Sequence, residues 1–483
     1  MSEPYRMTIG LEVHVQLKTR SKMFCGCATT FGAPPNTQVC PVCLGLPGVL
    51  PVMNRRAYEL AVRTALALDC TIARFTKFDR KSYYYPDLPK NYQISQYDLP
   101  LSSEGHLDVP DGNGATKPIG IIRVHLEEDA GKLLHNPAGD SLVDLNRTGI
   151  PLMEIVSKPD IHSLRDLEGY LAGLKRLLQY LDVSHCNMEE GNIRVDGNVS
   201  VQVDKEGREI STPISEIKNV NSFSACEKAL AYEADRLYEE WRQTGKTIKD
   251  APKQTRGWDD VRGVTVARRE KEEASDYRYF PEPDLAPVEI DEAWLAEIRS
   301  AIPELPLPRL RRFIADFGLS EYDAGVLVSD ARLADYFEEV LRLTGDPKAA
   351  ANWITQDLLR ELNSRKLSVD CLPLPVQKLA ELIKLVTDGV VSITAAREVF
   401  PKLIGCEMSA RELVEHEGLV QVSDTAELSG LVDKVIVENS KAAEDFRAGK
   451  EASFKFLVGQ VMRASRGKAN PKLVNDLLRE KLK

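Results

Sequence analysis

The chain has 483 residues, of which 43% are apolar and 28% are charged. Its length is roughly three times the usual ~150-residue domain, which predicts two to four domains, and its average composition excludes disordered, collagen-like and low-complexity proteins. No segment approaches the ~18 uninterrupted apolar residues of a membrane span, and residues 1–6 lack the apolar stretch of a signal peptide. We therefore expect a cytoplasmic protein without a membrane partner.

Residues 8–17 alternate between apolar and polar side chains, as a strand of a half-buried sheet does. The polar positions Glu12, His14 and Gln16 share one face of this predicted strand, and the other face is aliphatic. Carboxylates beside a histidine on one strand face are natural ligands for a hard divalent cation.

Four of the nine cysteines lie within nineteen positions, as Cys25, Cys27, Cys40 and Cys43. A Cys-x-Cys pair followed by a Cys-x-x-Cys pair suits tetrahedral Zn²⁺, because each pair can supply two ligands to the same ion from a tight turn. Four sulfur ligands leave no open position for a substrate, so we expect a structural ion that holds a loop. The alternatives are reduced thiols packed as small apolar groups, or a site that has lost its metal.

Residues 77–96 mix cations with aromatic side chains in a segment interrupted by prolines. Arg80, Lys81 and Lys90 are the candidate phosphate-binding cations, and the tyrosines are Tyr83, Tyr84, Tyr85 and Tyr92. Such a loop can clamp phosphate with its cations and stack a base or sugar on its rings, or it can simply bury the rings beneath itself. The chain contains no Walker A or Gly-x-Gly-x-x-Gly motif, so a nucleotide site would be of another type.

Residues 119–126 and 192–203 also alternate with period two and predict antiparallel strands, with a long helix between them at about residues 164–181. One polar face of the second segment carries Arg194, Asp196, Asn198, Ser200 and Gln202. Further acids lie at Glu127, Glu128 and Glu216. Convergence of these acids with residues 12–14 would require a cation to offset their repulsion, as in a metal-nucleotide site. The alternative is that residues 125–129 form an exposed acidic turn.

Beyond the proline-rich residues 281–287 the pattern becomes that of successive amphipathic helices. Ser320 predicts a helix start, and Gly345, Asp346 and Pro347 predict a helix end followed by a new start. Another junction, between residues 404 and 409, precedes a small helical module. The chain has a formal charge of −10, but residues 447–483 carry +7, which is typical of a solvated helical face or of a nucleic-acid-binding surface.

Five segments together resemble one known family. They are EVHVQL at 12–17, CPVCLGLPG at 40–48, YPDLPK at 85–90, HLEEDAGK at 125–132 and DYRYF at 276–280. The chain is similar to the B subunit of the bacterial aspartyl/glutamyl-tRNA amidotransferases, in which these motifs occur in the same order, and the resemblance runs from about residue 8 to the C-terminus.

The resemblance implies an α+β fold. It implies a catalytic domain over residues 1–293, with an antiparallel sheet like that of glutamine synthetase and a zinc-binding insertion, then a helical domain over 294–407 and a YqeY-like, tRNA-binding tail domain over 408–483. It also implies an enzyme that uses ATP and Mg²⁺ to phosphorylate the side-chain carboxylate of tRNA mischarged with Glu or Asp. Ammonia released from glutamine by the A subunit, an amidase, then displaces the phosphate, in a complex that includes the small C subunit.

The same resemblance assigns residues by their place in the matching motifs. Ligands of Mg²⁺ are implied at Glu12, His14, Glu127, Glu128 and Glu216. Contacts with ATP phosphates are implied for Arg80, Lys81 and Lys218, with the cavity lined further by Arg194, Asp196, Asn198 and Ser200. We expect catalysis to depend on His14, Glu127, Lys81, Arg80 and Lys218. The chain departs from the family pattern at Gln202, Ile214 and Lys253, close to these sites.

Two other functions stay open at this point. A non-catalytic, zinc-containing RNA-binding scaffold would use the cysteines and the basic tail but leaves the carboxylates without a role. A ligase that joins ammonia to a free small acid would use the metal site but leaves the basic tail without one. Dependence of ATP hydrolysis on charged tRNA distinguishes the three functions.

Overall fold

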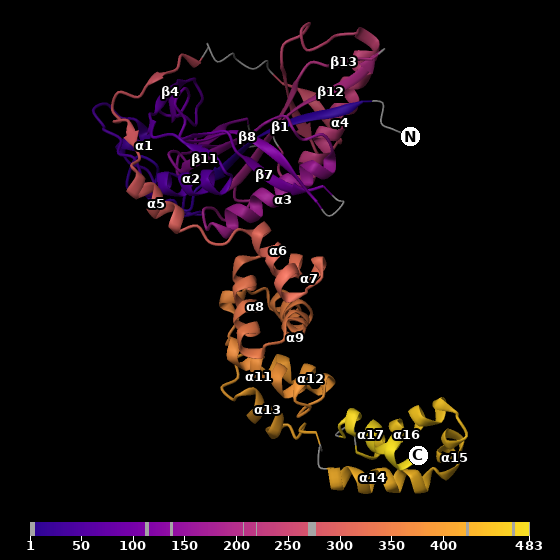
Figure 1. Cartoon of the computed structure of the whole chain (residues 1–483). Helices are drawn as coiled ribbons and strands as arrows, with labels where there is room; N and C mark the ends of the chain where they lie inside the picture. The colour runs from indigo at the N-terminus through magenta and orange to yellow at the C-terminus, as the bar shows by residue number, and fades with distance from the viewer. Residues whose placement is uncertain are drawn as a thin grey trace. The chain divides into compact units, whose positions relative to one another are not determined.

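The computed structural model describes residues 5–111, 115–135, 139–205, 207–218, 220–268, 277–421, 425–465 and 469–482 (Figure 1). The chain folds into two compact units, Met1–Leu305 and Pro306–Lys483. Asp276, which opens the last matching motif, and residues 466–468 and 483 of the basic segment lie outside the described residues. The first unit combines strands with helices, and the second is built from helices.

A large sheet forms the centre of the first unit. Its strands and side branches are β1 (Arg6–Gln16), β2 (Thr71–Ile72), β4 (Asp79–Ser82), β5 (Tyr92–Ser95), β6 (Ser102–Ser103), β7 (His106–Pro110), β8 (Thr116–Glu128), β11 (Pro151–Ser157), β12 (Ile193–Lys205), β13 (Arg208–Ser211), β14 (Ser215–Lys218), β15 (Gln254–Asp259), β16 (Val264–Ala267) and β17 (Phe280–Pro281). The main order is β16-β15-β14-β12-β1-β11-β8-β5-β4-β17. Among the described strand pairs of this sheet, β14–β15 is the parallel one. The predicted α+β class and the strands predicted at 8–17, 119–126 and 192–203 are thus confirmed.

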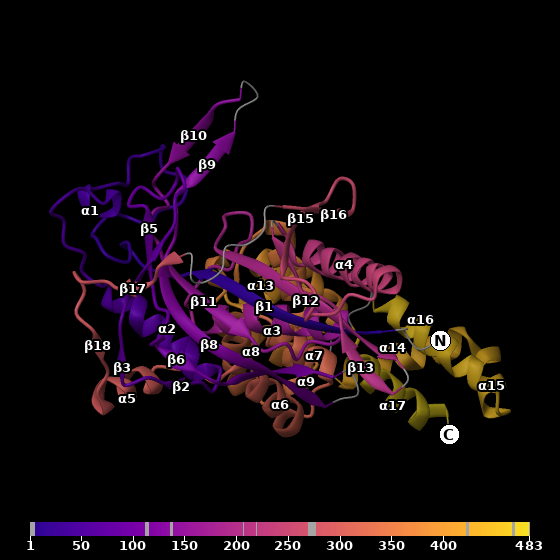
Figure 2. The same cartoon turned by 90° about the horizontal axis from the view of Figure 1, so that it is seen from above.

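The sheet has an apolar face covered by helices and a polar face. Along β1 the side chains alternate, with Val13 and its apolar neighbours fully buried and the polar positions half-buried. The apolar face packs against α2 (Arg55–Ala67), α3 (Leu164–Tyr180) and α4 (Phe223–Thr244). At Gly197 a Cβ would lie 2.9 Å from a methyl group of Leu230 in α4, so a larger residue here would force the Leu230 side chain to move. Figure 2 looks onto the strands from above.

Smaller elements decorate this unit. They are α1 (Pro41–Leu44), the hairpin β9 (Lys132–His135) with β10 (Ser141–Asp144), the pair β3 (Phe75–Thr76) with β18 (Val288–Glu289), and α5 (Glu292–Ser300). The hairpin projects from the sheet on the side of α1 (Figure 2). The domain boundary expected at residue 293 falls inside α5, whose Leu295 and Ile298 are buried in the core of the first unit.

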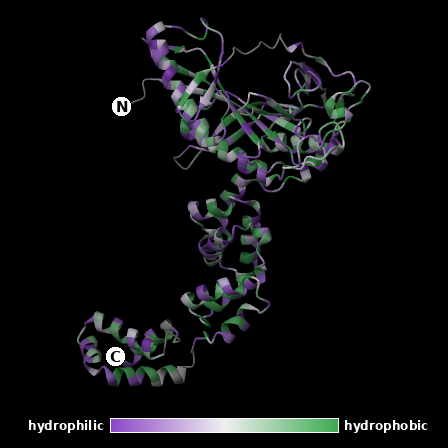
Figure 3. Cartoon of the chain, turned by 180° about the vertical axis from the view of Figure 1, so that it is seen from behind, coloured by the Kyte–Doolittle hydropathy of each residue, from purple (hydrophilic) through white to green (hydrophobic). Residues whose placement is uncertain are grey.

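The second unit contains two separate apolar cores. The first core is built from α6 (Pro306–Phe317), α7 (Glu321–Leu327), α8 (Ala331–Thr344), α9 (Pro347–Asn352), the π-helix η2 (Trp353–Leu358), α10 (Leu359–Arg365), the 3₁₀ turn η3 (Val369–Cys371), α11 (Val376–Thr387), α12 (Ile393–Leu403) and α13 (Ala410–His416). The second is built from α14 (Thr425–Glu438), α15 (Ser440–Arg447), α16 (Glu451–Ala464) and α17 (Pro471–Leu482). Apolar and polar residues are interspersed along these helices (Figure 3).

Local signals in the sequence set several of these helix ends. The Ser320 hydroxyl accepts a hydrogen bond from Asp323 N at the start of α7. Gly345 ends α8 in the left-handed conformation, and Asp346 caps α9 with Pro347 in its first turn. The expected tail boundary at residue 408 lies before α13, whose Leu413 packs in the first helical core. No helix within the described part of the chain is both long and apolar enough to cross a membrane.

Candidate active site

Polar positions of neighbouring strands meet on the open face of the sheet. β1 pairs with β12 so that His14 lies opposite Arg194. On the other side of β1, β11 places Glu154 opposite His14, and β8 places His125 opposite Glu154. Directly opposed residues of antiparallel strands point to the same face. Strands that are distant in sequence therefore contribute to one polar surface.

A pocket of about 1170 Å³ opens on this surface. The predicted residues among its lining are His14, Lys81, Glu127, Arg194, Asp196 and Lys218. They come from β1, β4, β8, β12 and β14. This volume exceeds the ~300–1,000 Å³ of typical small-molecule sites, so the pocket has room for more than one reactant.

His14, Glu127 and Glu154 form a group that can hold a metal ion. One ligand atom from each lies within 4.8 Å of the others. His14 Nε2 is 3.7 Å from Glu127 Oε1 and 3.5 Å from Glu154 Oε2. His14 and Glu127 line the pocket, and Glu154 lies beside His14 on the same face of the sheet. One imidazole nitrogen and two carboxylate oxygens in this arrangement fit a divalent cation, which could take water or phosphate oxygens from the pocket side.

The protonation of this group reflects its charges. Burial alone would lower the pKa of His14, but the hydrogen bond and charge of Glu154 and the charge of Glu127 outweigh it and raise the pKa to about 9. Burial would raise the pKa of Glu154, but His125, at 3.2 Å, and His14 hold it well below its ordinary value. Without a cation, protonated His14 therefore balances the carboxylates, and a bound cation would have to displace that proton.

Asp129 organises the cations at one end of the pocket. Its carboxylate accepts hydrogen bonds from Arg194 at 2.9 Å and from Gln16 at 2.8 Å, and it lies 3.6 Å from Arg147. Burial would raise the pKa of Asp129, but the charges of Arg194 and Arg147 hold it below its ordinary range. Arg194 is thus fixed in orientation and largely neutralised.

The predicted residues on β12 and β14 lie along the same polar face. Lys218 Nζ is 3.1 Å from Asp196 and 3.8 Å from Glu216, and these acids raise the pKa of Lys218 although burial opposes them. Glu12 accepts a hydrogen bond from Asn198 at 3.1 Å. None of Glu12, Asn198 or Glu216 is a lining residue of the pocket, and Ser200, farther along β12, is buried. Glu216 is fully buried and accepts a 3.0 Å hydrogen bond from Thr255.

Lys81 differs from the other pocket cations in its partners. Its ammonium lies 4.9 Å from the ring of Tyr277 and 5.9 Å from that of Tyr83. Within the described ranges it forms no ion pair with a carboxylate. A cation held by aromatic faces keeps its charge available for an anionic ligand. Of the tyrosines expected to stack on a ligand, Tyr83 lines the pocket, whereas Tyr84 and Tyr85 are exposed.

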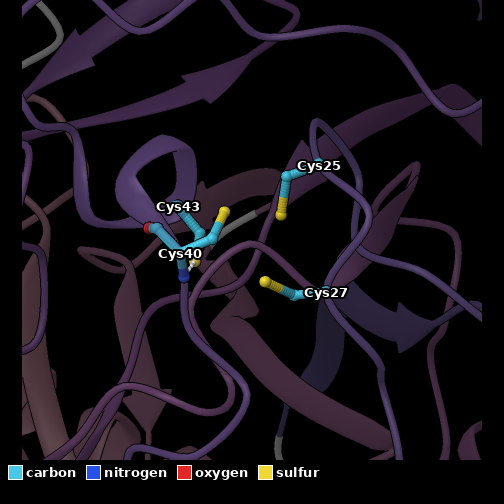
Figure 4. Close-up of side chains that lie close together, drawn as sticks. All are labelled: Cys25, Cys27, Cys40 and Cys43. Atoms are coloured by element: carbon cyan, nitrogen blue, oxygen red, sulfur yellow. Dashed lines mark hydrogen bonds between the residues drawn. The ribbon is translucent and has the colours of Figure 1, made fainter.

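The four clustered cysteines form a second group with metal-binding geometry. Their sulfur atoms all lie within 4.8 Å of one another, where tetrahedral Zn²⁺ with ~2.3 Å bonds requires separations of about 3.8 Å. Figure 4 shows Cys25 and Cys27 turned toward Cys40 and Cys43 at the start of α1. The hydrogen bond from Cys25 lowers the pKa of Cys43 to about 4, whereas burial raises that of Cys27 to about 11. The donor set therefore fits a structural ion.

Comparison with known proteins decides the family. The family model of the GatB/GatE catalytic domain matches residues 7–296. A second family model, the GatB (Yqey) domain, matches residues 335–482. The B subunit of an aspartyl/glutamyl-tRNA(Asn/Gln) amidotransferase from Moorella thermoacetica is 53% identical over 99% of this chain and 100% of its own length. A protein of the same name from Carboxydothermus hydrogenoformans is 51% identical over 99% of this chain and 99% of its own length. Another, from Rhodopirellula baltica, is 47% identical over 98% of this chain and 96% of its own length. The chain belongs to the GatB family.

This membership confirms the resemblance found in the sequence. GatB proteins belong to a tRNA-dependent amidotransferase, which is a ligase. The match to the GatB catalytic domain contains both the pocket and the cysteine cluster. The match to the second GatB domain includes α14–α17, which carry the basic segment.

The structure does not bring Arg80 to the pocket of this GatB protein. Arg80 lies opposite Ile94, so it points to the face of β4 away from Lys81. Its guanidinium makes two 2.7 Å hydrogen bonds to Glu282, and it lies 4.4 Å from the ring of Tyr92. These partners satisfy its charge, so Arg80 is not free to bind phosphate.

Glu128 is also separated from the pocket. It follows Glu127 on β8 and therefore points to the opposite face. There its carboxylate accepts hydrogen bonds from Lys90 and from Ile94 N. The side chains of Lys90 and Glu128 are both buried beside the cysteine cluster, so neither of these predicted residues contributes to the polar face.

Glu154 was not anticipated from the sequence. It stands in β11 between Met153 and Ile155, where a single acid in an apolar run carries no motif. The sequence feature that could have identified it is its place at the centre of the apolar run Pro151–Ser157, in which Leu152, Met153 and Ile155 are buried. A largely buried charge in such a strand requires a partner, and here the partners are two histidines.

Proposed function

We propose that this chain phosphorylates the side-chain carboxylate of tRNA mischarged with Glu or Asp and then replaces the phosphate with ammonia. The observation that carries the proposal is one pocket lined by the cation Lys81 and by His14 and Glu127, two members of the metal-type group that Glu154 completes. Family membership supports the use of a tRNA-linked acid. The proposed partners are the amidase (the A subunit), the small C subunit and the mischarged tRNA.

His14, Glu127 and Glu154 would hold the divalent cation. When bound, Mg²⁺ supplies positive charge next to the phosphate oxygens of ATP. The residues of the chain orient the reactants: Lys81 attracts the transferred phosphate, while Lys218 and Arg194 keep acids of the pocket walls paired. Two reactants held in one pocket no longer have to meet by diffusion.

The proposed chemistry has two balanced steps. A carboxylate oxygen of the aminoacyl ester attacks the γ-phosphorus of ATP, and ADP leaves. Ammonia then attacks the carbonyl carbon of the acyl phosphate, inorganic phosphate leaves with the bonding electrons, and the nitrogen loses a proton to give the amide. The first step is needed because a carboxylate is a very poor acceptor for ammonia, whereas an acyl phosphate has a good leaving group.

The two adjacent cations of β4 give a sharp test of the phosphate site. Lys81→Ala is expected to weaken ATP binding at least ~10-fold, because it removes a pocket cation that is held by aromatic rings and pairs with no acid among the described residues. Arg80→Ala is expected to destabilise the fold by roughly 3–5 kcal/mol, because it leaves the buried Glu282 unpaired, with less effect on ATP affinity. Nucleotide titration and denaturant unfolding of both variants measure the two effects. Equal loss of ATP affinity in both would contradict this assignment.

The cysteine cluster would bind Zn²⁺ in a purely structural role. Its four sulfur donors complete a tetrahedron, so no position is left for substrate. Its chain segment is bound to the pocket side of the unit, since Asn36 hydrogen-bonds Asp144 and Leu145. We propose that the ion stabilises this loop.

The tail module would bind the tRNA body. Lys455 and Arg463 on α16 are exposed and form no ion pair among the residues described. Changing both to Glu is expected to raise the KM for tRNA and to reduce the slope of log K against log[salt] by about 1 for each phosphate that the tail no longer neutralises. Lys158→Glu, on the surface of the first unit, serves as control. An unchanged salt slope would count against the tail as an RNA surface. Truncation of the chain before Arg447 would test the same role less directly, because it removes most of the apolar core of the tail.

One experiment separates the candidate functions. The complex is incubated with ATP, Mg²⁺, glutamine and tRNA charged with Glu or Asp, and the esterified amino acid is identified by mass spectrometry. Conversion to Gln or Asn, with ATP hydrolysis dependent on the charged tRNA, is expected. No ATP turnover would favour the RNA-binding scaffold, and turnover with a free small acid alone would favour the small-molecule ligase.

A further inference from the structure

Lys22 is a buried lysine for which the proposed function gives no role. Its side chain is 1% exposed. Its ammonium donates hydrogen bonds to Gln38 O at 2.7 Å and to Leu145 O at 3.5 Å, and it lies 3.6 Å from Cys43 Sγ. Over the ranges that the structure describes, it forms no ion pair with a carboxylate. Gln38 and Cys43 belong to the cysteine-bearing loop, and Leu145 belongs to a distant segment of the chain.

A buried ammonium requires a compensating negative charge, because desolvation of an unpaired charge costs several kcal/mol. Among the three acceptors of Lys22, the sulfur of Cys43 is the one that can carry negative charge. Four thiolates around one divalent ion have a net charge of −2, which resides on the sulfur atoms. An N–H group directed at one of these sulfurs lowers the energy of the loaded cluster.

The same ammonium also contacts the turn that leads to the pocket. Leu145 O accepts a hydrogen bond from Thr148 N as well as from Lys22, so it fixes the turn that contains Arg147. Arg147 donates to Ala130 O and Gly131 O at 2.9 and 2.6 Å and lies near Asp129. Asp129 in turn orients Arg194. The Lys22 side chain therefore links the cysteine cluster to the segment that carries Arg147 at one end of the pocket.

We propose that Lys22 is a positioning residue that stabilises a metal-loaded cysteine cluster and holds the Leu145–Arg147 turn against it. The inference rests on the proposed metal role of the four cysteines and adds a residue outside the ligand set. It assigns to Lys22 both the counter-charge of the cluster and the link to the pocket wall.

Lys22→Met tests the counter-charge, with Lys158→Met, on the surface of the same unit, as matched control. Metal release from the intact complex into excess chelator is followed with a chromogenic zinc indicator. Lys22→Met is expected to release its ion about 10–100-fold faster than the wild type, as loss of an outer-sphere partner does, and Lys158→Met at the wild-type rate. With Co²⁺ in place of Zn²⁺, the sulfur-to-metal charge-transfer band is expected to shift in Lys22→Met only.

A measurement on the wild type covers the case in which Lys22→Met does not fold. Lysine methylation mapped by peptide mass spectrometry is expected to leave Lys22 unmodified in the loaded protein and to modify it after chelation, while Lys158 reacts in both states. Equal release rates for the two variants, or protection of Lys22 that does not depend on metal, would overturn the role of Lys22 alone. Absence of stoichiometric metal in the wild type would overturn the metal role of the cysteines, and this inference with it.

Discussion

Glu127→Gln is expected to lower ATP-dependent amidation of the tRNA-linked acid by about 100- to 1000-fold while the glutaminase activity of the amidase partner stays largely intact. Gln keeps the shape of the side chain but removes one of the two carboxylates of the metal-type group. Loss of charge stabilisation at a phosphoryl-transfer centre costs on the order of 10²–10³ or more in rate. His14→Ala is expected to have the same effect. Single-turnover assays of Gln- or Asn-tRNA formation, run beside glutamine hydrolysis, measure both activities.

The control for this pair is Glu104→Gln, which removes an exposed acid of the same unit that pairs with Lys158. It is expected to leave both activities unchanged. Metal titration with Mn²⁺, followed by electron paramagnetic resonance, reports directly on the group. Normal amidation by Glu127→Gln or His14→Ala would exclude these residues from the reaction centre.

Cys43→Ser is expected to reduce bound zinc from about one equivalent to near zero and to lower the Tm by about 10 °C. Serine is a poor zinc ligand, and loss of a structural ion removes stabilisation of the loop that it closes. At 2–4 °C per kcal/mol, a loss of ~3 kcal/mol in the free energy of unfolding gives a shift of this size. Elemental analysis and calorimetry measure the two quantities.

Cys371→Ser provides the matched thiol control, because Cys371 is exposed in the second unit. It is expected to change neither the zinc content nor the Tm. Retention of zinc in Cys43→Ser would show that three cysteines suffice or that the ion binds elsewhere. Cys25→Ser, Cys27→Ser and Cys40→Ser should then be compared in the same way.

The sequence predicted each strand face but not the pairing between strands. Period-two alternation is a local property, so it correctly placed Glu12, His14 and Gln16 on one face of β1. The register that sets Glu154 beside His14 joins residues 140 positions apart, and it depends on the packing of the whole sheet. No spacing rule within one chain segment contains that information.

The same limit explains the contrast between Arg80 and Lys81. Two adjacent residues of a strand must point to opposite faces, but a basic pair in the sequence does not reveal which of them faces the ligand. Glu282 decides the question, since it binds Arg80 from 202 residues away. The cysteine spacing was more informative, because all four ligands lie within one short segment and the turn between each pair is local.

The back-to-back arrangement of Glu127 and Glu128 limits how this protein can be redesigned. Lys90, the partner of Glu128, packs its aliphatic stem against Gly45, where a Cβ would lie 2.2 Å from the Lys90 side chain. Deleting the cysteine-bearing loop, to obtain a variant without the metal site, would expose the Lys90–Glu128 salt bridge to water. Water would then reach the face of β8 opposite to Glu127. A shortened version would therefore need an apolar replacement for both Lys90 and Glu128 before the reaction centre could keep its shape.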